Sequence, residues 1–394
     1  MAPLFKSSPI EPPPFSFTRF FTMAEICRGV VTEKPSSASA DSSSHAARSE
    51  GDANRRLKLV AGVRTVGNNN GLKKARLNIS PASFSRSADV VKPSSADGEP
   101  NPKFGVASVC GRRREMEDTV AIHPSFTDLD DNQTSNTHYF GVYDGHGCSH
   151  VARMCKDRLH LLVREELNMN EWKMTMEQSF RRMDAEVVTG NKQGDCRCEV
   201  HGSESYGVGS TAVVAVVTPE KIVIANCGDS RAVLCRNGRA VALSNDHKPD
   251  RPDELSRIQD VGGRVLYWDG ARVCGVLAMS RAIGDDYLKP YVICEPEVTI
   301  TDRTTEDDCL ILASDGLWDV VSNATACGLA RMCLKGNRPS AEMKSPPVND
   351  VSGYENCDPT CSNASLLLTK LALARRSMDN VSVVVIDLRK NGSL

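Results

Sequence analysis

The chain has 394 residues, of which 40% are hydrophobic, 5% aromatic and 25% charged, an ordinary globular composition for one large domain with appendages. Residues 1–100 carry 14 Lys and Arg against 9 Asp and Glu, whereas the remaining residues carry 34 against 41. Because nucleic-acid phosphates attract a net basic face, the acidic remainder argues against general nucleic-acid binding, and it suits a protein that gathers cations.

Membrane spanning and classical secretion are not expected. No stretch approaches the roughly 18 consecutive apolar residues of a transmembrane helix, and the N-terminus lacks the pattern of a secretory signal. The 15 cysteines are odd in number and form no paired C-x-x-C motifs, which favours reduced, mostly buried thiols. Cys196 with Cys198, and Cys357 with Cys361, are alternative metal or redox candidates, but no second pair or His stands at zinc spacing.

Residues 1–102 are rich in Ser, Pro and Asn and show no sustained strand or helix period. This predicts a disordered basic extension, followed by a folded domain over 103–394. The Ser-rich start resembles an organellar transit peptide, but its glutamates weaken that interpretation, and Met23 is a second candidate start. Basic clusters at 55–58 and 73–76 are candidate nuclear-import signals, with solvated charge as the alternative.

Short β-branched runs ended by polar turns predict strands in the folded domain, and apolar residues at helical spacing between them predict helices. The order mixes hairpins with separate helices, which favours an α+β fold of antiparallel sheets flanked by helices over a βαβ array. Residues 335–359, with Pro, Gly, Asn and Ser, predict a mobile surface insertion. The expected strands are 138–143, 211–217, 221–226, 232–235, 309–313 and 381–387, and the expected helices are 149–167, 253–261, 324–334 and 361–376.

Carboxylates stand where these strands begin or end. Asp144 and Asp315 each follow an apolar run, Asp379 precedes one, and Asp229 follows a fourth. Glu117 follows a run of three arginines. Clustered carboxylates repel one another unless cations neutralise them, and oxygen ligands without Cys or His favour magnesium or manganese. Taken alone, each piece can also be a turn, a hairpin tip or a solvated patch.

Eight segments in this order resemble the metal-dependent type 2C protein serine/threonine phosphatases. The resemblance covers about residues 103–390 and implies a central β-sandwich of two antiparallel sheets, helices outside each sheet and a dimetal site at one edge. The segments are Arg-Arg-Arg-Glu-Met-Glu-Asp (112–118), Val-Tyr-Asp-Gly-His-Gly (142–147), Val-Gly-Ser-Thr-Ala (208–212), Gly-Asp-Ser-Arg (228–231), Asp-His-Lys-Pro (246–249), Ser-Arg-Ala-Ile-Gly-Asp (280–285), Ser-Asp-Gly-Leu-Trp-Asp (314–319) and Asp-Asn-Val-Ser (379–382).

The resemblance implies two Mg²⁺ or Mn²⁺ ions per active site, and a weaker third ion in some relatives. A water that bridges two divalent cations is partly deprotonated near neutral pH and can attack phosphorus in line, without a covalent phosphoenzyme. The implied metal ligands are Asp144, which bridges both ions, the carbonyl of Gly145, Glu117 for one ion, Asp315 and Asp379 for the other, and Asp229 and Asp319 with Asp315 for the third; Asp118 would stand behind them.

Two further residues carry implied catalytic roles. Arg113 aligns with the phosphate-clamping arginine and can offer bidentate hydrogen bonds to phosphate oxygens, although Arg112 and Arg114 compete within the run. His146 resembles the general acid that protonates the leaving serine or threonine oxygen. The alternative for His146 is a histidine that only hydrogen-bonds a metal ligand.

A narrower resemblance, over residues 262–273 and 275–281, is to the plant clade A branch, the co-receptors of abscisic acid signalling. In that branch the tryptophan that matches Trp268 projects from a flap and inserts into the hormone-closed receptor, whereas the alternative is an ordinary packed tryptophan. The receptor would approach the backbone at Gly147, where a side chain would intrude. Cys274 replaces a larger apolar residue, which predicts looser packing of the flap and an oxidisable thiol.

The resemblance to this branch implies a place in a hormone signalling pathway. The enzyme would dephosphorylate SNF1-related kinases and would be inhibited by abscisic acid receptors in the hormone-bound state, as a monomer in the nucleus and cytoplasm. One alternative is a catalytically weak docking protein for kinases or receptors, against which the full set of mutually repelling carboxylates argues. Another is a hydrolase of small phosphoesters.

Overall fold

The computed structural model describes residues 102–126, 137–168, 171–190, 207–336 and 357–389. The predicted N-terminal extension, Met23, both basic clusters, the pair Cys196 and Cys198, and most of the predicted 335–359 insertion lie outside these residues. Within them the 12 cysteines are all free, as predicted, including Cys357 and Cys361. No helix in the described ranges is long and apolar enough to cross a bilayer.

Two five-stranded antiparallel sheets form the centre of the described domain. The first has the order β1-β15-β14-β8-β9 and the second the order β13-β7-β6-β3-β2. The strands of the first are β1 (Phe104–Val109), β15 (Val381–Asp387), β14 (Asp307–Ala313), β8 (Arg231–Arg236) and β9 (Arg239–Ala242). Those of the second are β13 (Glu297–Asp302), β7 (Lys221–Cys227), β6 (Ala212–Val217), β3 (His138–Tyr143) and β2 (Thr119–His123).

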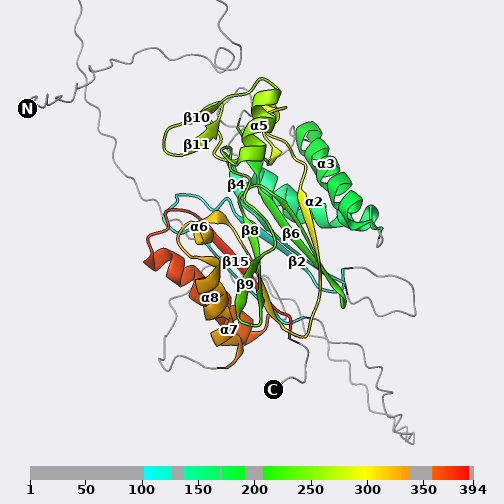
Figure 1. Ribbon diagram of the computed structural model, residues 1–394, viewed down its shortest axis with the longest axis vertical. Coiled ribbons are helices and arrows are strands. Elements are labelled where there is room, and N and C mark those ends of the chain that lie inside the picture. Colours follow the sequence, from blue (N-terminus) through cyan, green and yellow to red (C-terminus); the bar gives the residue numbers. More distant parts are fainter. Residues whose placement is uncertain (1–101, 127–136, 169–170, 191–206, 337–356, 390–394) are drawn as a thin grey trace, which may run out of the picture. The chain divides into compact units, whose positions relative to one another are not determined.

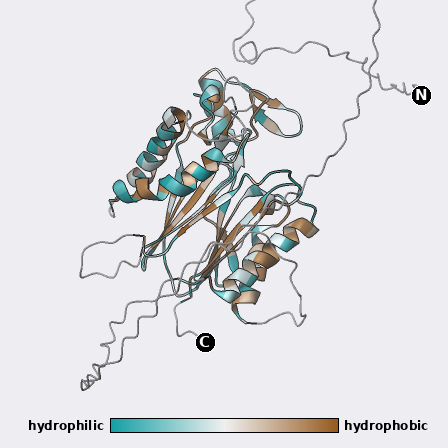
Figure 2. Ribbon diagram, turned by 180° about the vertical axis from the view of Figure 1, so that it is seen from behind, coloured by the Kyte–Doolittle hydropathy of each residue, from teal (hydrophilic) through white to brown (hydrophobic). Residues whose placement is uncertain are grey.

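The continuous apolar runs of the central strands are explained by burial on both faces. Along β15, Val384 and Ile386 face the interior between the sheets, whereas Val383 and Val385 pack against the helices outside. Alternation of side chains across a strand makes this possible, because successive residues point to opposite faces. Figure 2 shows the strands of both sheets as mainly hydrophobic.

Helices cover the outer face of each sheet (Figure 1). α2 (His150–Glu165) and α3 (Trp172–Gly190) pack on the second sheet, and α6 (Asp315–Trp318), α7 (Asn323–Leu334) and α8 (Pro359–Ala374) pack on the first. Asp358 begins α8 by accepting hydrogen bonds from the amides of Thr360 and Cys361 at 2.8 and 3.1 Å. The predicted α+β sandwich is therefore confirmed, with α3, α6, β1, β2, β9 and β13 as additional elements of its sheets and covering helices.

Two small sheets and one helix complete the domain. The first small sheet joins β12 (Ile283–Gly284), β5 (Gly209–Ser210) and β4 (Gly145–His146), and the 3-10 turn η1 (Asp286–Leu288) follows β12. The second is the hairpin β10 (Val265–Tyr267) and β11 (Ala271–Val273), which we call the flap. The flap packs with α5 (Pro252–Asp260) around the buried Ile258 and Val273.

Candidate active site

The carboxylates predicted at strand ends come from both sheets. Asp144 directly follows β3, Asp315 begins α6 straight after β14, and Asp379 lies two residues before β15. Glu117 lies two residues before β2. Because β2 and β3 belong to one sheet and β14 and β15 to the other, these residues lie at one edge where the two sheets face each other.

Backbone contacts hold this edge together. The amide of Gly145 donates to the Glu117 carbonyl at 3.3 Å, and the amide of Thr211 donates to the Asp144 carbonyl at 2.9 Å. The Asn380 side chain accepts a 2.7 Å hydrogen bond from the Glu117 amide. These hydrogen bonds fix the strand ends through backbone atoms and the Asn380 side chain, without using a carboxylate.

The site is strongly acidic. Burial raises the pKa of Asp144 well above its usual value, and the charges of Asp118, Asp315, Asp229 and Asp379 raise it further. Burial and the charges of Asp229 and Asp379 likewise raise the pKa of Asp315. The mutual repulsion shows that the fold brings these carboxylates within electrostatic range of one another, so the site favours a bound cation.

The donor atoms fit hard divalent cations. In the described part of the chain, buried carboxylate oxygens of Asp118, Asp229 and Asp315 have no hydrogen-bond partner. Among the described residues, no group of three His, Cys, Asp or Glu side chains is already arranged to hold a metal ion. Mg²⁺ keeps several waters and takes only a few carboxylates directly, so an open set of oxygens suits Mg²⁺ or Mn²⁺ better than zinc.

Of the two leading arginines in the run, Arg113 lies beside the carboxylates. Its guanidinium contacts the Asp379 carboxylate at 2.6 Å. Burial lowers the pKa of Arg113, but the Asp379 carboxylate raises it, and the pKa lies above its usual value. Arg112 instead donates to the backbone carbonyls of Leu373 and Ser377 at 3.3 and 2.7 Å. Arg113 is therefore the one of these two that can meet a phosphate at the site.

Lys248 provides a second positive charge, which the sequence analysis did not assign. Its ammonium contacts Asp229 at 2.6 Å. The pKa of Asp319 is raised above its usual value. Burial and the charge of Asp229 raise this pKa, and the charge of Lys248 opposes them. Asp229, Asp315 and Asp319 thus lie within electrostatic range of one another, with Lys248 as a counter-charge, and the third ion stays a prediction. Its only sequence signal was the segment 246–249.

His146 lies in β4, directly after Gly145. Its Nε2 atom is 2.7 Å from Oδ2 of Asp285, a buried carboxylate from the turn after β12. Burial tends to lower the pKa of His146, but the Asp285 carboxylate and the more distant Asp229 and Glu117 raise it above the usual value. Asp285 closes the segment 280–285, to which the sequence analysis gave no role.

Trp268 is exposed at the tip of the flap. Its exposed fraction is 68%, and that of the neighbouring Tyr267 is 66%. The turn that follows uses positive φ at Asp269 and Gly270, and the Trp268 amide donates to the Gly270 carbonyl at 3.1 Å. The alternative of an ordinary packed tryptophan is therefore wrong, because the hairpin turns the ring out of the core formed with α5.

The structure shows a backbone requirement for glycine at position 147 and a buried position for Cys274. Gly147 adopts a φ of +74°, and a Cβ there would lie 2.1 Å from the Gly207 carbonyl oxygen. A side chain at Gly147 would thus strain the chain itself. Cys274 is buried at 7% exposure, also at positive φ, and its amide donates to Arg264 at 2.7 Å. Its thiol lies in the packed base of the flap.

A helix-covered β-sandwich with a buried carboxylate cluster at its edge and a guanidinium beside it defines a metal-dependent phosphohydrolase. The family model of protein phosphatase 2C matches residues 103–381. The chain is 55% identical over 383 residues to the probable protein phosphatase 2C 24 of Arabidopsis thaliana, covering 93% of this chain and all of that protein. It is 54% identical over 329 residues to the probable protein phosphatase 2C 9 of Oryza sativa subsp. japonica, covering 76% and 78%.

The chain therefore belongs to the protein phosphatase 2C family and is a metal-dependent protein serine/threonine phosphatase of the Mg²⁺ or Mn²⁺ type. Solved structures agree on the fold. A serine-threonine phosphatase 2C from Toxoplasma gondii is 23% identical and superposes with a TM-score of 0.57, covering 74% of this chain and 96% of that one. These relatives favour the predicted enzyme over the predicted docking protein.

Proposed function

We propose that the chain hydrolyses phosphoserine and phosphothreonine with two ions, held by Glu117, Asp144, the Gly145 carbonyl, Asp315 and Asp379. When bound, the ions would supply a partly deprotonated water as the nucleophile near neutral pH. The observation that carries the proposal is the buried, mutually repelling carboxylate cluster at one edge of the sheets. Asp229 and Asp319, together with Asp315, would hold the weaker third ion.

Two residues would act on the phosphoryl group itself. Arg113 would release Asp379 and take two phosphate oxygens, which neutralises the charge that builds up as the ester bond breaks. His146 would pass its proton to the leaving serine or threonine oxygen while the P–O bond breaks, and would regain a proton from solvent. In support, both side chains border the carboxylate cluster.

A phosphate-release assay tests this reaction. The substrate is a phosphoserine peptide from a kinase activation loop, with Mg²⁺ or Mn²⁺ and then with chelator. Metal-dependent release by the wild type, lost in Asp144→Ala, is the expected result. No release with either metal would contradict the enzyme and leave the docking protein as the remaining alternative. Equal release from small phosphoesters and phosphopeptides would favour the small-molecule hydrolase.

The proposed pathway is abscisic acid signalling. Without hormone the enzyme would dephosphorylate SNF1-related kinases; with hormone, the bound receptor would cover the active site and release the kinases. The exposed Trp268 supports this, because an aromatic ring held out on a short hairpin is suited to anchor a partner. The enzyme would act as a monomer in the nucleus and cytoplasm, without binding nucleic acid.

Inhibition by a soluble abscisic acid receptor tests the pathway. Hormone and receptor should inhibit the wild type and fail to inhibit Trp268→Ala, while activity without receptor stays unchanged. Met174→Ala, which truncates another exposed apolar side chain on α3, is the matched control and should stay inhibited. Wild-type activity that ignores hormone and receptor would keep the phosphatase and remove it from this pathway.

A further inference from the structure

Ser314 joins the two large sheets at the edge that carries the proposed metal ligands. It follows β14 of the first sheet and directly precedes Asp315. Its hydroxyl donates a 2.8 Å hydrogen bond to Oδ2 of Asp118, which lies directly before β2 of the second sheet. Both residues are buried, Ser314 completely and Asp118 at 4% exposure. One buried hydrogen bond thus connects the sheets beside the carboxylate cluster.

The backbone of Ser382, in β15, fixes the direction of the Ser314 hydroxyl. Oγ of Ser314 accepts a 3.1 Å hydrogen bond from the Ser382 amide, and the Ser314 amide donates to the Ser382 carbonyl at 3.1 Å. Because an amide N–H can only donate, Oγ keeps its single proton for the carboxylate. Ser314 is the N-cap residue of α6, where a serine usually caps the helix, yet its side chain makes no capping hydrogen bond. The hydroxyl therefore serves Asp118 and not the helix.

This hydrogen bond differs in kind from the packing between the sheets. The side chains that fill the interior, such as Phe140 of β3 and Leu312 of β14, are apolar. Apolar burial is non-directional, so it holds the sheets together without fixing their offset. A hydrogen bond weakens steeply as its distance and angle change. The contact between Ser314 and Asp118 therefore adds a directional constraint that the apolar interior does not supply.

Metal binding at this edge depends on how the sheets are placed. The proposed ligands divide between them: Glu117 and Asp144 border strands of the second sheet, and Asp315 and Asp379 border strands of the first. Ions that these ligands share would require one spacing of the sheets. Asp118 lies close to Asp144, because after burial its charge is the strongest cause of the raised pKa of Asp144. A change in the position of Asp118 would therefore be felt at a proposed ligand.

We propose that Ser314 is a positioning residue for metal binding: through Asp118, it holds the ligands of the second sheet at the spacing from Asp315 that the ions require. The inference rests on the proposed function, in which ligands from both sheets share the ions. Because Ser314 acts through another residue, its loss should weaken metal binding more than it slows hydrolysis by the loaded enzyme.

Titration of the full chain with Mn²⁺ alone, followed by calorimetry, tests the proposal. Ser314→Ala should raise the Kd for Mn²⁺ about 10-fold, at the lower end of the effect of residues that support metal ligands. Ser314→Cys fills the same space but offers only a weak donor, so it should show the same loss, and it carries the test if Ser314→Ala does not fold. The KM for a phosphoserine peptide and kcat at saturating Mn²⁺ should both stay within about threefold of the wild type.

A double variant tests whether Ser314 acts through Asp118. Asp118→Ala should itself raise the Kd for Mn²⁺, and adding Ser314→Ala should change it by less than about twofold, because both remove the same contact. Ser179→Ala is the matched control. Ser179 is fully buried and donates to the Thr175 carbonyl of its own helix, α3, at 2.7 Å. This variant should bind Mn²⁺ like the wild type.

The proposal and the function on which it rests fail differently. Unchanged Mn²⁺ affinity in Ser314→Ala, even with a loss of stability in urea, would show a merely structural hydrogen bond and overturn the proposal. Wild-type affinity in Ser314→Cys would assign the loss to a cavity, and additive losses in the double variant would assign it to a route that bypasses Asp118; either result overturns the proposal. Mn²⁺ binding that survives in Asp144→Ala, or none in the wild type, would contradict the proposed metal site itself.

Discussion

At the residue scale, the carboxylates that suit cation binding lower the stability of the folded protein when no cation is bound. Asp144 is buried among other carboxylates, and both its burial and its neighbours oppose its ionised form. The positive charges nearby, Arg113 and Lys248, pair with Asp379 and Asp229 rather than with Asp144. Without a divalent cation, the ionised Asp144 therefore destabilises the folded protein.

Asp144→Asn should consequently be inactive yet more stable in the absence of metal. We expect phosphatase activity to fall at least about 1,000-fold, because the proposed ligand of both ions is lost. The free energy of unfolding in chelator should rise by about 1 kcal/mol, because one buried like charge disappears. Urea unfolding with and without Mg²⁺ measures both effects, and Mg²⁺ should stabilise the wild type much more than the variant.

The exposed Asp302 provides the control, since its side chain has an exposure of 80%. Asp302→Asn should change neither activity nor the Mg²⁺ effect. If Asp144→Asn in chelator were instead less stable than the wild type, the carboxylate would be a net stabilising group, and the view of the site as a cluster of mutually repelling carboxylates would be wrong.

The sequence could predict the carboxylates but not their supporting partners. Asp144, Asp315 and Asp379 each border an apolar run, so strand prediction alone puts them at strand ends. The contact between His146 and Asp285 joins residues 139 positions apart through three two-residue strands, which have no detectable period. Such a contact depends on tertiary structure, and only the match of segment 280–285 to a family motif could have drawn attention to it.

At the element scale, strands buried on both faces were predictable, and the long helix α3 was missed, as was the short helix α6. The apolar runs of β6, β14 and β15, buried along their whole length, identify them as inner strands. α3 carries buried Trp172, Met176, Phe180, Met183 and Val187 at helical spacing, so its periodicity could have revealed it. β13 was harder, because no residue of this edge strand is fully buried.

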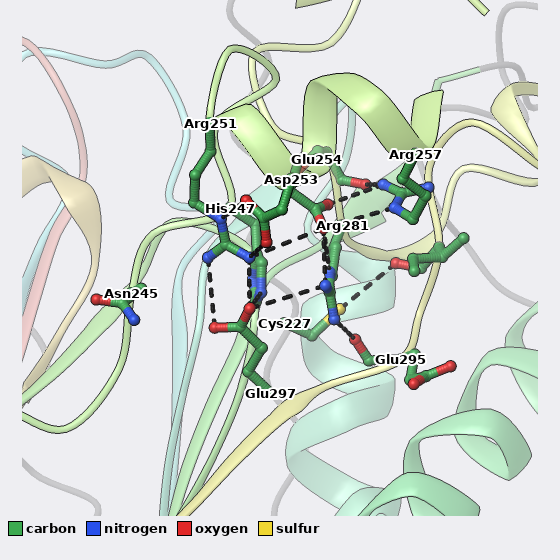
Figure 3. Close-up of polar contacts among 12 residues, drawn as sticks. Cys227, Asn245, His247, Arg251, Asp253, Glu254, Arg257, Arg281, Glu295 and Glu297 are labelled. Atoms are coloured by element: carbon green, nitrogen blue, oxygen red, sulfur yellow. Dashed lines mark hydrogen bonds and ion pairs between the residues drawn. The ribbon is translucent and has the colours of Figure 1, made fainter. Parts of the chain in front are cut away.

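An ionic network fixes α5 to the second sheet (Figure 3). Glu254 of α5 is 1% exposed and accepts hydrogen bonds from Arg281 and Arg257 at 2.7 and 2.8 Å. Although burial favours the neutral form, these arginines hold the pKa of Glu254 well below its usual value. Arg251 contacts Glu297 at the start of β13, which links the helix to the sheet.

Glu254→Gln should destabilise the domain by about 3 kcal/mol, because it leaves two partly buried guanidinium groups without their counter-charge. Urea unfolding measures this change. Asp253→Asn, at the neighbouring position with a side-chain exposure of 62%, is the control and should change stability by less than about 0.5 kcal/mol. An equally small effect of Glu254→Gln would show that the network does not anchor α5.

At the scale of the whole domain, several histidines are folded in their neutral form. His138, at the start of β3, is 5% exposed, and its Nδ1 accepts a 3.1 Å hydrogen bond from the Ser125 amide. Burial, helped by Arg303, lowers the pKa of His138 to about 4. Burial and the charge of His160, which stacks on His123 at 3.6 Å, also lower the pKa of His123 to about 4.

The domain should therefore lose stability as pH falls from about 6.5 towards 4. In this window the unfolded chain binds protons at both histidines, with an ordinary pKa of about 6.5, while the folded protein does not. The contribution of His138 should reach about 2 kcal/mol at pH 5. His138→Asn keeps an acceptor for the Ser125 amide and cannot titrate, so its unfolding free energy should depend less on pH than that of the wild type.

The measurement is urea unfolding of the wild type, His138→Asn and His123→Asn at several pH values between 7.5 and 5, with saturating Mg²⁺ to keep the active-site carboxylates ionised. Because the other titrating groups are common to all three proteins, the difference between each variant and the wild type isolates one histidine. Each variant should gain relative to the wild type as pH falls. Parallel curves would mean that these histidines are protonated in the folded protein, and that the sandwich tolerates the charge.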